Sequence, residues 1–435
     1  MTIEDRDKSG VSDGKPPKLI GATNLFRNTG FIFAADLLFA LGRALTFFLL
    51  GIAMGVDQLG QYAAVLGLTQ LIFPASRWGI AHIMVRNVTR GEPFAAGWSK
   101  VVSVNVLGGL LGSAVSVAAS AILFDVSLRT TFLIGLSQLI GLGVQQAGGM
   151  AAAAHGRAQI GLLINAINTT LRVGAILIFF YAVSTQTIDV WAYFLVTTML
   201  AGAVTTLTVI RTTLGGRIRF ALPTRLDLRM GAGFVFVDSA NSAQADLDKV
   251  VLGGFGLDAD TGVYAAAYRV ADLASLPLGA LVRASYSEFF RRGSKTIAEA
   301  VRYARKLTIA SVSYGLVAGV LLWVTAPLLE VLMGSQFEDS VTVLRWIAFV
   351  PAIRAAQFFP ANVLTGSDRQ WVRARLMTGT ASLNLVMNII LVPRHGWRGA
   401  AVTTMISEAV FTLLLWMAVN RALRAEQVAN YDNAG

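Results

Sequence analysis

Long runs of apolar residues recur along the whole of this sequence, and each run is close to the length of a membrane-spanning helix. A helix needs roughly 20 apolar residues to cross the hydrocarbon core of a bilayer. Charged residues make up only 14% of the chain, whereas a soluble domain carries about 25%. The sequence therefore predicts an all-α integral membrane protein with about twelve transmembrane helices. The expected spans are 28–53, 60–84, 101–124, 130–153, 159–182, 190–210, 231–255, 260–286, 307–328, 340–364, 371–392 and 399–420.

The basic residues outside these spans fall almost entirely on one side of the membrane. With the N-terminus in the cytoplasm, the cytoplasmic segments carry 25 Lys and Arg, and the opposite loops carry only Arg129, Arg394 and Arg398. Because cytoplasmic loops are enriched in basic residues, we expect a multi-pass protein with both termini in the cytoplasm. The formal net charge of +11 then reflects topology, and no nucleic-acid partner is expected.

Thiol and metal chemistry are not indicated by the composition. The chain has no cysteine, and its three histidines, His82, His155 and His395, are far apart in the sequence. This pattern predicts neither disulfides nor a metal site, and we expect no cofactor and no catalytic residue.

An internal repeat divides the expected helices into two sets of six. Gly60-Gln61-Tyr62-Ala63-Ala64 recurs 202 residues later as Gly262-Val263-Tyr264-Ala265-Ala266, and the same offset relates Asp36 to Asp238. Six is an even number, so the two halves share one orientation in the membrane, and transporters often place a central site between such repeats. We expect a cytoplasmic tail at 1–27, an N-lobe at 28–212, a basic linker at 213–230, a C-lobe at 231–421 and a second cytoplasmic tail at 422–435.

Charged residues inside the expected spans are the strongest functional signal. Each costs about 2.5–3.5 kcal/mol at the centre of a membrane helix, so each is expected to pair, to reach a helix end or to face water. Structural pairing is expected for Asp246 with Lys249 and for Arg269 with Asp272, because residues three apart share a helix face. Arg77, Arg283 and Arg345 could instead lie near helix ends. The charged residues of the spans are Arg43, Arg77, Arg172, Lys249, Arg269, Arg283, Arg345, Arg354, Asp36, Asp238, Asp246, Asp248, Asp272 and Glu408.

Several of these cations lack a carboxylate three or four residues away, and prolines interrupt neighbouring helices. Pro74 and Pro277 break the second and eighth spans at matching depth, and kinked helices need protein or water around the freed backbone groups. We interpret the first, second, seventh, eighth and tenth spans as the lining of a hydrated cationic lumen; alternatively, the prolines only shape packing. Candidate substrate-binding residues are Arg43, Arg77, Arg172, Lys249, Arg269 and Arg354.

A cationic lumen predicts an anionic substrate, and the planar fork of arginine suits phosphate. The carboxylates Asp36, Asp238, Asp248 and Asp272 are candidates for coupling transport to a proton or cation, because such groups often serve as relays. We expect Asp36 to be held ionised by Arg43, which lies two turns away on the same face of the helix. Asp238 has no arginine in that register and is the better candidate proton carrier.

The later part of the chain resembles a known family. Asp248-Lys249-Val250-Val251-Leu252-Gly253 and Gly262-Val263-Tyr264-Ala265-Ala266-Ala267-Tyr268-Arg269 resemble the seventh and eighth helices of Wzx-type polysaccharide repeat-unit flippases. Asn384, Asn388-Ile389-Ile390-Leu391-Val392-Pro393 and Gly396 with Gly399-Ala400-Ala401 resemble helices eleven and twelve of the same family. The resemblance follows the helix order over most of the chain.

The resemblance implies a fold, a substrate and partners. These flippases belong to the MOP superfamily and share the MATE-like fold of two six-helix lobes. The implied substrate is an undecaprenyl-diphosphate-linked oligosaccharide, moved between leaflets of a bacterial inner membrane for O-antigen, capsule or exopolysaccharide synthesis. Its diphosphate would meet the arginines and its sugars could stack on aromatic side chains. Membrane lipids, a polysaccharide polymerase and chain-length proteins are the implied partners.

Alternatives from other functional classes remain open. A MATE-type exporter of small organic cations would need surplus carboxylates, whereas the spans hold eight basic and six acidic residues. A lipid II flippase of the same superfamily would carry two further C-terminal helices. A membrane enzyme of polysaccharide assembly would need catalytic groups on sizeable loops, and the sequence has no HExxH, nucleophile elbow or P-loop. A non-transporting scaffold would leave the buried charges unexplained.

Overall fold

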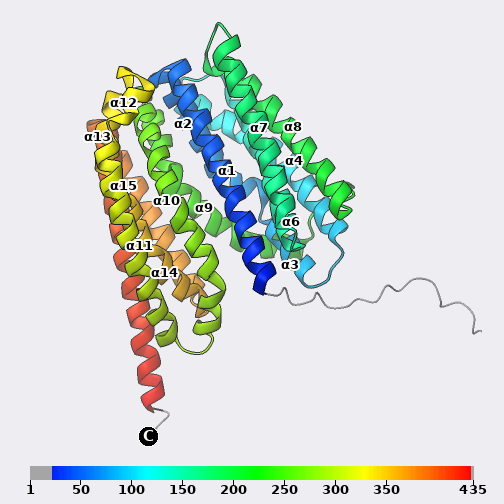
Figure 1. Ribbon diagram of the computed structural model, residues 1–435, viewed down its shortest axis with the longest axis vertical. Coiled ribbons are helices and arrows are strands. Elements are labelled where there is room, and N and C mark those ends of the chain that lie inside the picture. The colour runs from blue at the N-terminus through cyan, green and yellow to red at the C-terminus, as the bar shows by residue number, and fades with distance from the viewer. Residues whose placement is uncertain (1–21, 433–435) are drawn as a thin grey trace, which may run out of the picture.

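The computed structural model describes residues 22–432, and within them the chain is almost entirely helical (Figure 1). The parts of the expected tails at 1–21 and 433–435 lie outside the described residues. The elements are α1 (Ala22–Met54), α2 (Val56–Arg77), α3 (Ile80–Thr89), α4 (Phe94–Leu123), α5 (Leu128–Leu136), the π-helix η1 (Ser137–Leu142), α6 (Gly143–Ala154), α7 (Ala158–Ala182), α8 (Ile188–Leu214), α9 (Arg225–Gly254), α10 (Asp258–Gly293), α11 (Ile297–Thr325), α12 (Leu328–Met333), the 3-10 helix η2 (Ser335–Phe337), α13 (Glu338–Ile347), α14 (Val350–Gly366) and α15 (Gln370–Asp432).

All twelve expected spans are helical, but several are broken. The second span divides into α2 and α3 at Trp78 and Gly79, which both have positive φ. The expected spans 371–392 and 399–420 both lie in α15, where Gly396 interrupts the helical backbone at φ 53° and ψ −135°. Of the described helices, seven are long and apolar enough to cross a membrane, and the pair α13 and α14, bent by 42°, makes an eighth. The protein is a multi-pass membrane protein.

Several helices extend beyond the expected spans, and two of them reach into segments expected to be a linker or a tail. α9 begins at Arg225 and so includes 225–230 of the expected linker. The reason is a capping box, in which the side chain of Thr224 accepts from the Asp227 backbone and the Asp227 side chain accepts from the Thr224 backbone. Such reciprocal caps satisfy backbone donors that a helix start leaves unpaired. At the other end, α15 continues as a helix to Asp432, through the segment expected to be a tail.

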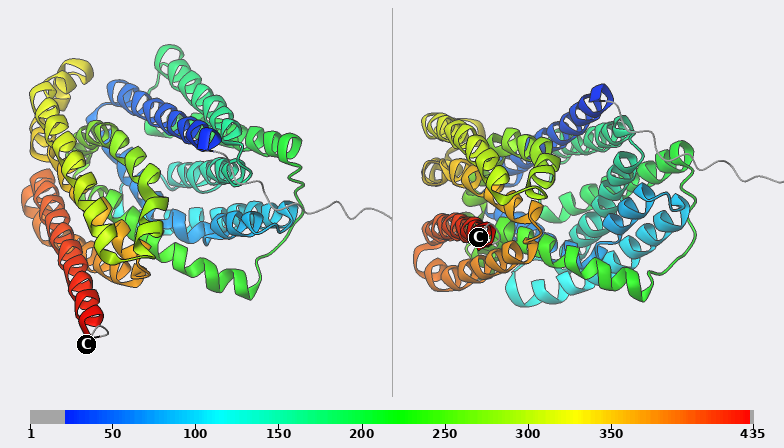
Figure 2. Two further views of the ribbon diagram at one scale, coloured as in Figure 1. Left: turned by 60° about the horizontal axis from the view of Figure 1, so that its bottom comes forward. Right: turned by 90° about the horizontal axis from the view of Figure 1, so that it is seen from below.

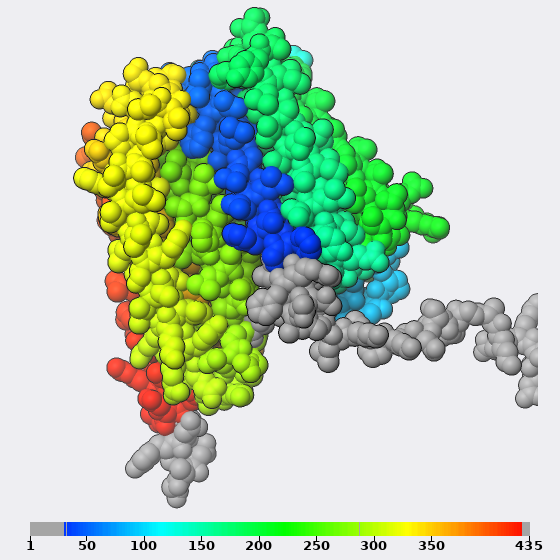
Figure 3. Space-filling view, in the orientation of Figure 1, coloured from blue at the N-terminus to red at the C-terminus, as the bar shows by residue number. Residues whose placement is uncertain are grey.

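The helices form two groups, α1–α8 and α9–α15. Figure 2 shows the early helices, blue to green, gathered on one side, and the late helices, yellow to red, on the other. Helix α1 packs against α7 of its own group and also contacts α10 of the other group, as the space-filling surface of Figure 3 also shows. The largest cluster of buried apolar side chains contains residues from both groups, among them Phe47, Tyr62, Tyr264 and Trp397.

The repeat found in the sequence forms the crossing of α2 and α10, near the start of each helix. A Cβ on Gly60 would lie 1.9 Å from the carbonyl oxygen of Asp258, and a Cβ on Gly262 would lie 2.2 Å from that of Val56. The 202-residue offset that relates the two glycines also relates Val56 to Asp258. The crossing is therefore pseudo-symmetric, and the backbones meet so closely that only glycine fits.

Candidate functional site

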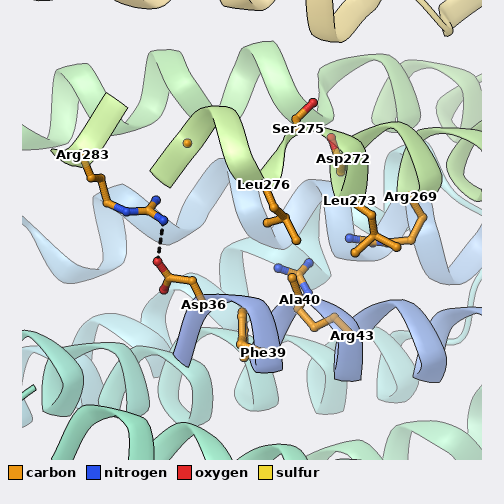
Figure 4. A pocket seen from close by; sticks show the side chains of 11 residues that line it. Asp36, Phe39, Ala40, Arg43, Arg269, Asp272, Leu273, Ser275, Leu276 and Arg283 are labelled. Carbon is orange, nitrogen blue, oxygen red and sulfur yellow. Dashed lines mark ion pairs between the residues drawn. The ribbon is translucent and has the colours of Figure 1, made fainter. Parts of the chain in front are cut away.

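A pocket of about 400 Å³ lies between α1 and α10, that is, between the two lobes. Helix α1 contributes Asp36, Phe39 and Arg43, whose spacing of three and four residues places them on one helix face. Helix α10 contributes Arg269 and Arg283 to the facing wall, together with Asp272. Figure 4 shows Asp36 and Arg283 pointing toward each other across the space between the two helices, with the guanidinium groups of Arg43 and Arg269 in the same space.

Three arginines from three helices lie close together at this site: Arg43 on α1, Arg172 on α7 and Arg269 on α10. The charges of Arg172 and Arg269 both act on the Arg43 guanidinium, and that of Arg269 acts on Arg172. A smaller void beside the pocket is lined by Arg43 and Arg269 and also by Asp246 and Lys249. We call Arg43, Arg172 and Arg269 the arginine cluster.

No member of the arginine cluster forms an ion pair within the described residues, where the ion pairs involve other cations. The Nε atoms of Arg172 and Arg269 have no hydrogen-bond partner among residues 22–432. Arg43 lies 5.5 Å from the ring centre of Phe39 and Arg269 lies 4.9 Å from that of Phe47. Aromatic faces attract cations but do not neutralise them.

Unpaired guanidinium groups away from water are costly. The effective penalty for a buried ion is several kcal/mol even after relaxation, and the three like charges also repel one another. The cluster is thus stable only if water reaches it or an anion supplies the missing charge. Because arginine donates to two oxygens at once, phosphate is a well-matched counter-charge.

The carboxylates of the pocket are already occupied by cations outside the cluster. Asp36 pairs with Arg283 of α10 at 2.8 Å, and Asp272 pairs with Arg354 of α14 at 3.6 Å. The expected partner of Asp36 was Arg43, and this is wrong because Arg283 approaches from the opposite helix. The expected pair of Arg269 with Asp272 is likewise not formed.

The pairing expected within α9 is confirmed. Lys249 Nζ lies 2.9 Å from Asp246 Oδ1 and 3.8 Å from Asp248 Oδ1. Asp248 is buried and accepts a hydrogen bond of 2.6 Å from the Tyr264 hydroxyl of α10. These two predicted site residues, Asp248 and Lys249, therefore belong to one polar network inside the C-lobe.

Arg354 and Arg77, both predicted to bind substrate, have partners from other helices. Arg354 donates to Glu408 of α15 at 3.0 Å, in addition to its pair with Asp272. Arg77 donates to Gln146 at 2.9 Å, and its guanidinium lies 3.8 Å from the centre of the Phe73 ring. In the arginine cluster, by contrast, the one side-chain partner of this kind is the Tyr62 hydroxyl of α2 beside Arg172, and within the described residues no carboxylate pairs with Arg43, Arg172 or Arg269.

One residue that lines the pocket, Arg283, and one partner of a predicted residue, His82, were not among the predicted site residues. Arg283 follows Asp272, Leu276 and Gly279 at helical spacing, so its position on the pocket face of α10 was readable from the sequence. His82 of α3 lies 3.5 Å from Asp238 of α9. The spacing of residues in the sequence does not predict this contact, because the position of His82 depends on the break between α2 and α3.

Comparison with known proteins identifies the fold. No protein-family model matches the chain, and no characterised protein sequence is significantly similar to it. Among solved structures, the chain is similar to a multidrug resistance MATE family transporter of the MOP superfamily in an inward-facing conformation, with a TM-score of 0.70, 13% identity and coverage of 95% of this chain and 97% of that one. For an outward-facing conformation of such a transporter the TM-score is 0.63, with 14% identity and coverage of 92% and 96%.

A third similar structure is a MOP superfamily transporter from Pyrococcus furiosus, for which a reverse polarity of the binding pocket is described as suggesting a different function. It has a TM-score of 0.64 and 13% identity, and the match covers 93% of this chain and 96% of that one. At these identities the likeness establishes the fold. The chain has the MATE-like fold of two pseudo-symmetric helical lobes, as the sequence predicted.

Proposed function

We propose that the chain is a flippase that moves undecaprenyl-diphosphate-linked oligosaccharide repeat units from the cytoplasmic to the periplasmic leaflet of a bacterial inner membrane. In this proposal both termini are cytoplasmic, and the product feeds O-antigen, capsule or exopolysaccharide synthesis with a polymerase and chain-length proteins as partners. The protein performs no covalent chemistry and opens its central cavity alternately to the two sides.

The observation that carries the proposal is the arginine cluster. Two of its members, Arg43 and Arg269, line the inter-lobe cavity, and none of the three forms an ion pair among the described residues. A diphosphate supplies four or more oxygen acceptors and the negative charge that the cluster lacks, so binding removes the repulsion among Arg43, Arg172 and Arg269. Transport requires that the free energy of diphosphate binding be similar in the state open to the cytoplasm and in the state open to the periplasm. The carboxylates Asp36, Asp238, Asp248 and Asp272 remain candidates for coupling to a proton or cation.

A MATE-type exporter of small organic cations is the main alternative, and the fold is equally compatible with it. The electrostatics of the pocket favour the flippase. A cationic substrate would have to displace Arg283 from Asp36 or Arg354 from Asp272, and would still meet three unneutralised guanidinium groups. The description of the Pyrococcus furiosus transporter supports the idea that one fold can host pockets of different polarity.

The test is transport of a fluorescent polyprenyl-diphosphate disaccharide in proteoliposomes made with the full chain. Arg43→Ala should reduce initial transport at low substrate concentration by about tenfold to hundredfold, the worth of a charge-assisted hydrogen bond. Arg43→Lys should recover part of the loss, because lysine restores charge without the bidentate geometry. Arg129→Ala, which removes an exposed arginine that lies over the Tyr193 ring, is the control and should transport normally. Normal transport by Arg43→Ala would refute the proposal.

A further inference from the structure

A second pocket of about 400 Å³ adjoins the first, between α1, α6 and α7 of the N-lobe. The two pockets share three lining residues, Asp36, Phe39 and Arg283. The two pockets are therefore adjacent, and the Asp36–Arg283 ion pair and Phe39 lie at their common border. The volume of the second pocket is within the range of about 300–1,000 Å³ that small-molecule sites occupy.

The second pocket differs from the first in charge. Its charged lining residues are Asp36 and Arg283, which neutralise each other at 2.8 Å. Its remaining polar residues are the amides Gln145 and Gln146 on α6 and Asn165 on α7. We call it the amide pocket.

Each amide is positioned by hydrogen bonding at one of its two polar atoms, and its other polar atom keeps further capacity. Gln145 Nε2 donates to the Met199 carbonyl at 3.1 Å, Gln146 Oε1 accepts from Arg77 at 2.9 Å, and Asn165 Nδ2 donates to the Ala35 carbonyl at 3.3 Å. No hydrogen bond among the described residues uses Gln145 Oε1, Gln146 Nε2 or Asn165 Oδ1. The pocket thus offers both acceptors and a donor, held in place by the protein.

The rest of the lining is apolar and small. Apolar surface comes from Phe39, Leu142 and Met150. Gly149 on α6 and Gly161 on α7 also line the pocket, and because glycine has no side chain they leave its space unfilled. A Cβ on Gly149 would meet no atom within 4 Å, so the space over this residue is open rather than filled by a neighbour. A ligand with one apolar face and several neutral hydroxyl groups matches this combination.

We propose that the amide pocket holds the sugar next to the diphosphate, with its hydroxyls on Gln145, Gln146 and Asn165 and its ring over Phe39. This inference rests on the proposed flippase function and assigns the substrate's carbohydrate to a defined site. A lipid chain fits less well, because it would cover three amides without satisfying them. An organic cation would find no free negative charge in the amide pocket, since Arg283 already neutralises Asp36.

The experiment compares two soluble probes, farnesyl diphosphate and a farnesyl diphosphate that carries one N-acetylhexosamine. Binding is measured by isothermal titration on the purified full chain in nanodiscs. Gly149→Leu should fill the pocket without a clash and without helix strain. Gly174→Leu is the matched control, because Gly174 of α7 also has no atom within 4 Å of a Cβ position and lines neither pocket.

We expect the wild type and Gly174→Leu to bind the sugar-bearing probe about tenfold more tightly than farnesyl diphosphate, as one or two neutral hydrogen bonds would give. Gly149→Leu should abolish this difference and leave the affinity for farnesyl diphosphate unchanged. Asn165→Leu should reduce the difference in the same way, and it provides the test if Gly149→Leu fails to fold.

Equal weakening of both probes by Gly149→Leu would place the lipid or the phosphate in the amide pocket and overturn the assignment. Unchanged binding of both probes would also overturn it. If the wild type binds both probes equally while Arg43→Ala binds neither, the sugar site is refuted and the flippase proposal stands. If the wild type binds neither probe, the flippase proposal fails and the sugar site fails with it.

Discussion

At the scale of single residues, the function of each intramembrane arginine depends on which carboxylates reach it. Arg354 is mostly buried and has Glu408 at 3.0 Å and Asp272 at 3.6 Å, so its charge is neutralised within the protein. Arg43 has an aromatic neighbour and no ion pair among the described residues. The same residue type therefore stabilises the C-lobe at one site and remains available to a ligand at the other.

Arg354→Ala should destabilise the protein. Removing one partner of a buried ion pair leaves the other charge uncompensated, which costs about 3–5 kcal/mol. Glu408 is 6% exposed, so its carboxylate would lose its main counter-charge in a dry environment. Thermal unfolding in detergent should show a clear fall in Tm, and the double variant Arg354→Ala/Glu408→Gln should recover part of it. No recovery in the double variant would contradict this assignment.

Sequence reasoning succeeded for charges whose partners lie on the same helix. The Asp246–Lys249 pair was predictable, because three residues bring two side chains to one helix face. Asp36 and Asp272 were assigned the wrong partners, because Arg283 and Arg354 come from helices remote in sequence. Spacing along one helix carries no information about which other helix faces it.

At the scale of helices, the closest contact is the crossing of α2 and α10 through Gly60 and Gly262. Each glycine faces the carbonyl oxygen of the first residue of the other helix. The sequence repeat identified these glycines as equivalent. It did not reveal that the two copies pack against each other, since equivalence in sequence does not determine contact.

Gly60→Ala and Gly262→Ala should each destabilise the protein by about 1–3 kcal/mol, the usual cost of overpacking. The obstacle is backbone in both cases, so no side-chain rotation can relieve it. Gly174→Ala is the control and should be neutral or slightly stabilising, because alanine favours a helix and nothing lies within 4 Å. Melting temperatures of the three variants test this prediction. Equal values for all three would show that the backbones of α2 and α10 lie far enough apart at the crossing to admit a methyl group.

The start of α9 connects the two lobes through Asp227, which accepts from Lys100 of α4 at 2.7 Å. Partial burial alone would raise the pKa of Asp227, but hydrogen bonds from Lys100 and Thr224 outweigh it and hold the pKa below its ordinary value. A carboxyl whose pKa is lower in the folded protein stabilises the fold above its unfolded pKa, and this stabilisation is lost as the pH falls through the folded value.

Asp227→Asn should therefore lower the Tm at pH 7. The deficit relative to the wild type should shrink as the pH falls below about 4, where an unfolded aspartate becomes protonated. Differential scanning fluorimetry over pH 3–7 makes the comparison. A deficit that stays constant over this range would show that the charge on Asp227 contributes nothing.

At the scale of the whole molecule, the sequence predicted the fold class well. Apolar runs and the repeat predicted two helical lobes. Each helix that crosses the lipid needs a run of apolar residues, and the duplication repeats the order of these runs and some of their residues in the second half of the sequence. The sequence placed breaks at Pro74 and Pro277, but the second span breaks at Trp78 and Gly79, and α10 runs through Pro277 without a break. The break at Trp78 and Gly79, the π-helical turn at Ser137–Leu142 in the fourth span and the α13–α14 bend in the tenth span were not predicted, because they depend on packing.

The expected orientation can be tested with single cysteines, since the chain contains none. Ser294→Cys, at the exposed end of α10, should react with an impermeant maleimide only after the cytoplasmic side is opened. Ser184→Cys, in the exposed segment between α7 and α8, should react in intact cells with a permeable outer membrane. The 25-to-3 distribution of basic residues is the reason. Labelling of Ser294→Cys in intact cells would show that the orientation is opposite to the expected one.

The most direct test of the account is the preference of the central cavity for charge. Farnesyl diphosphate and farnesyl trimethylammonium have the same chain and opposite head groups, and their binding can be followed by the Tm of the purified protein. The diphosphate should raise the Tm of the wild type, the ammonium compound should not, and Arg43→Gln/Arg269→Gln should lose the diphosphate effect. Stabilisation by the ammonium compound alone, or an undiminished diphosphate effect in the double variant, would contradict the account.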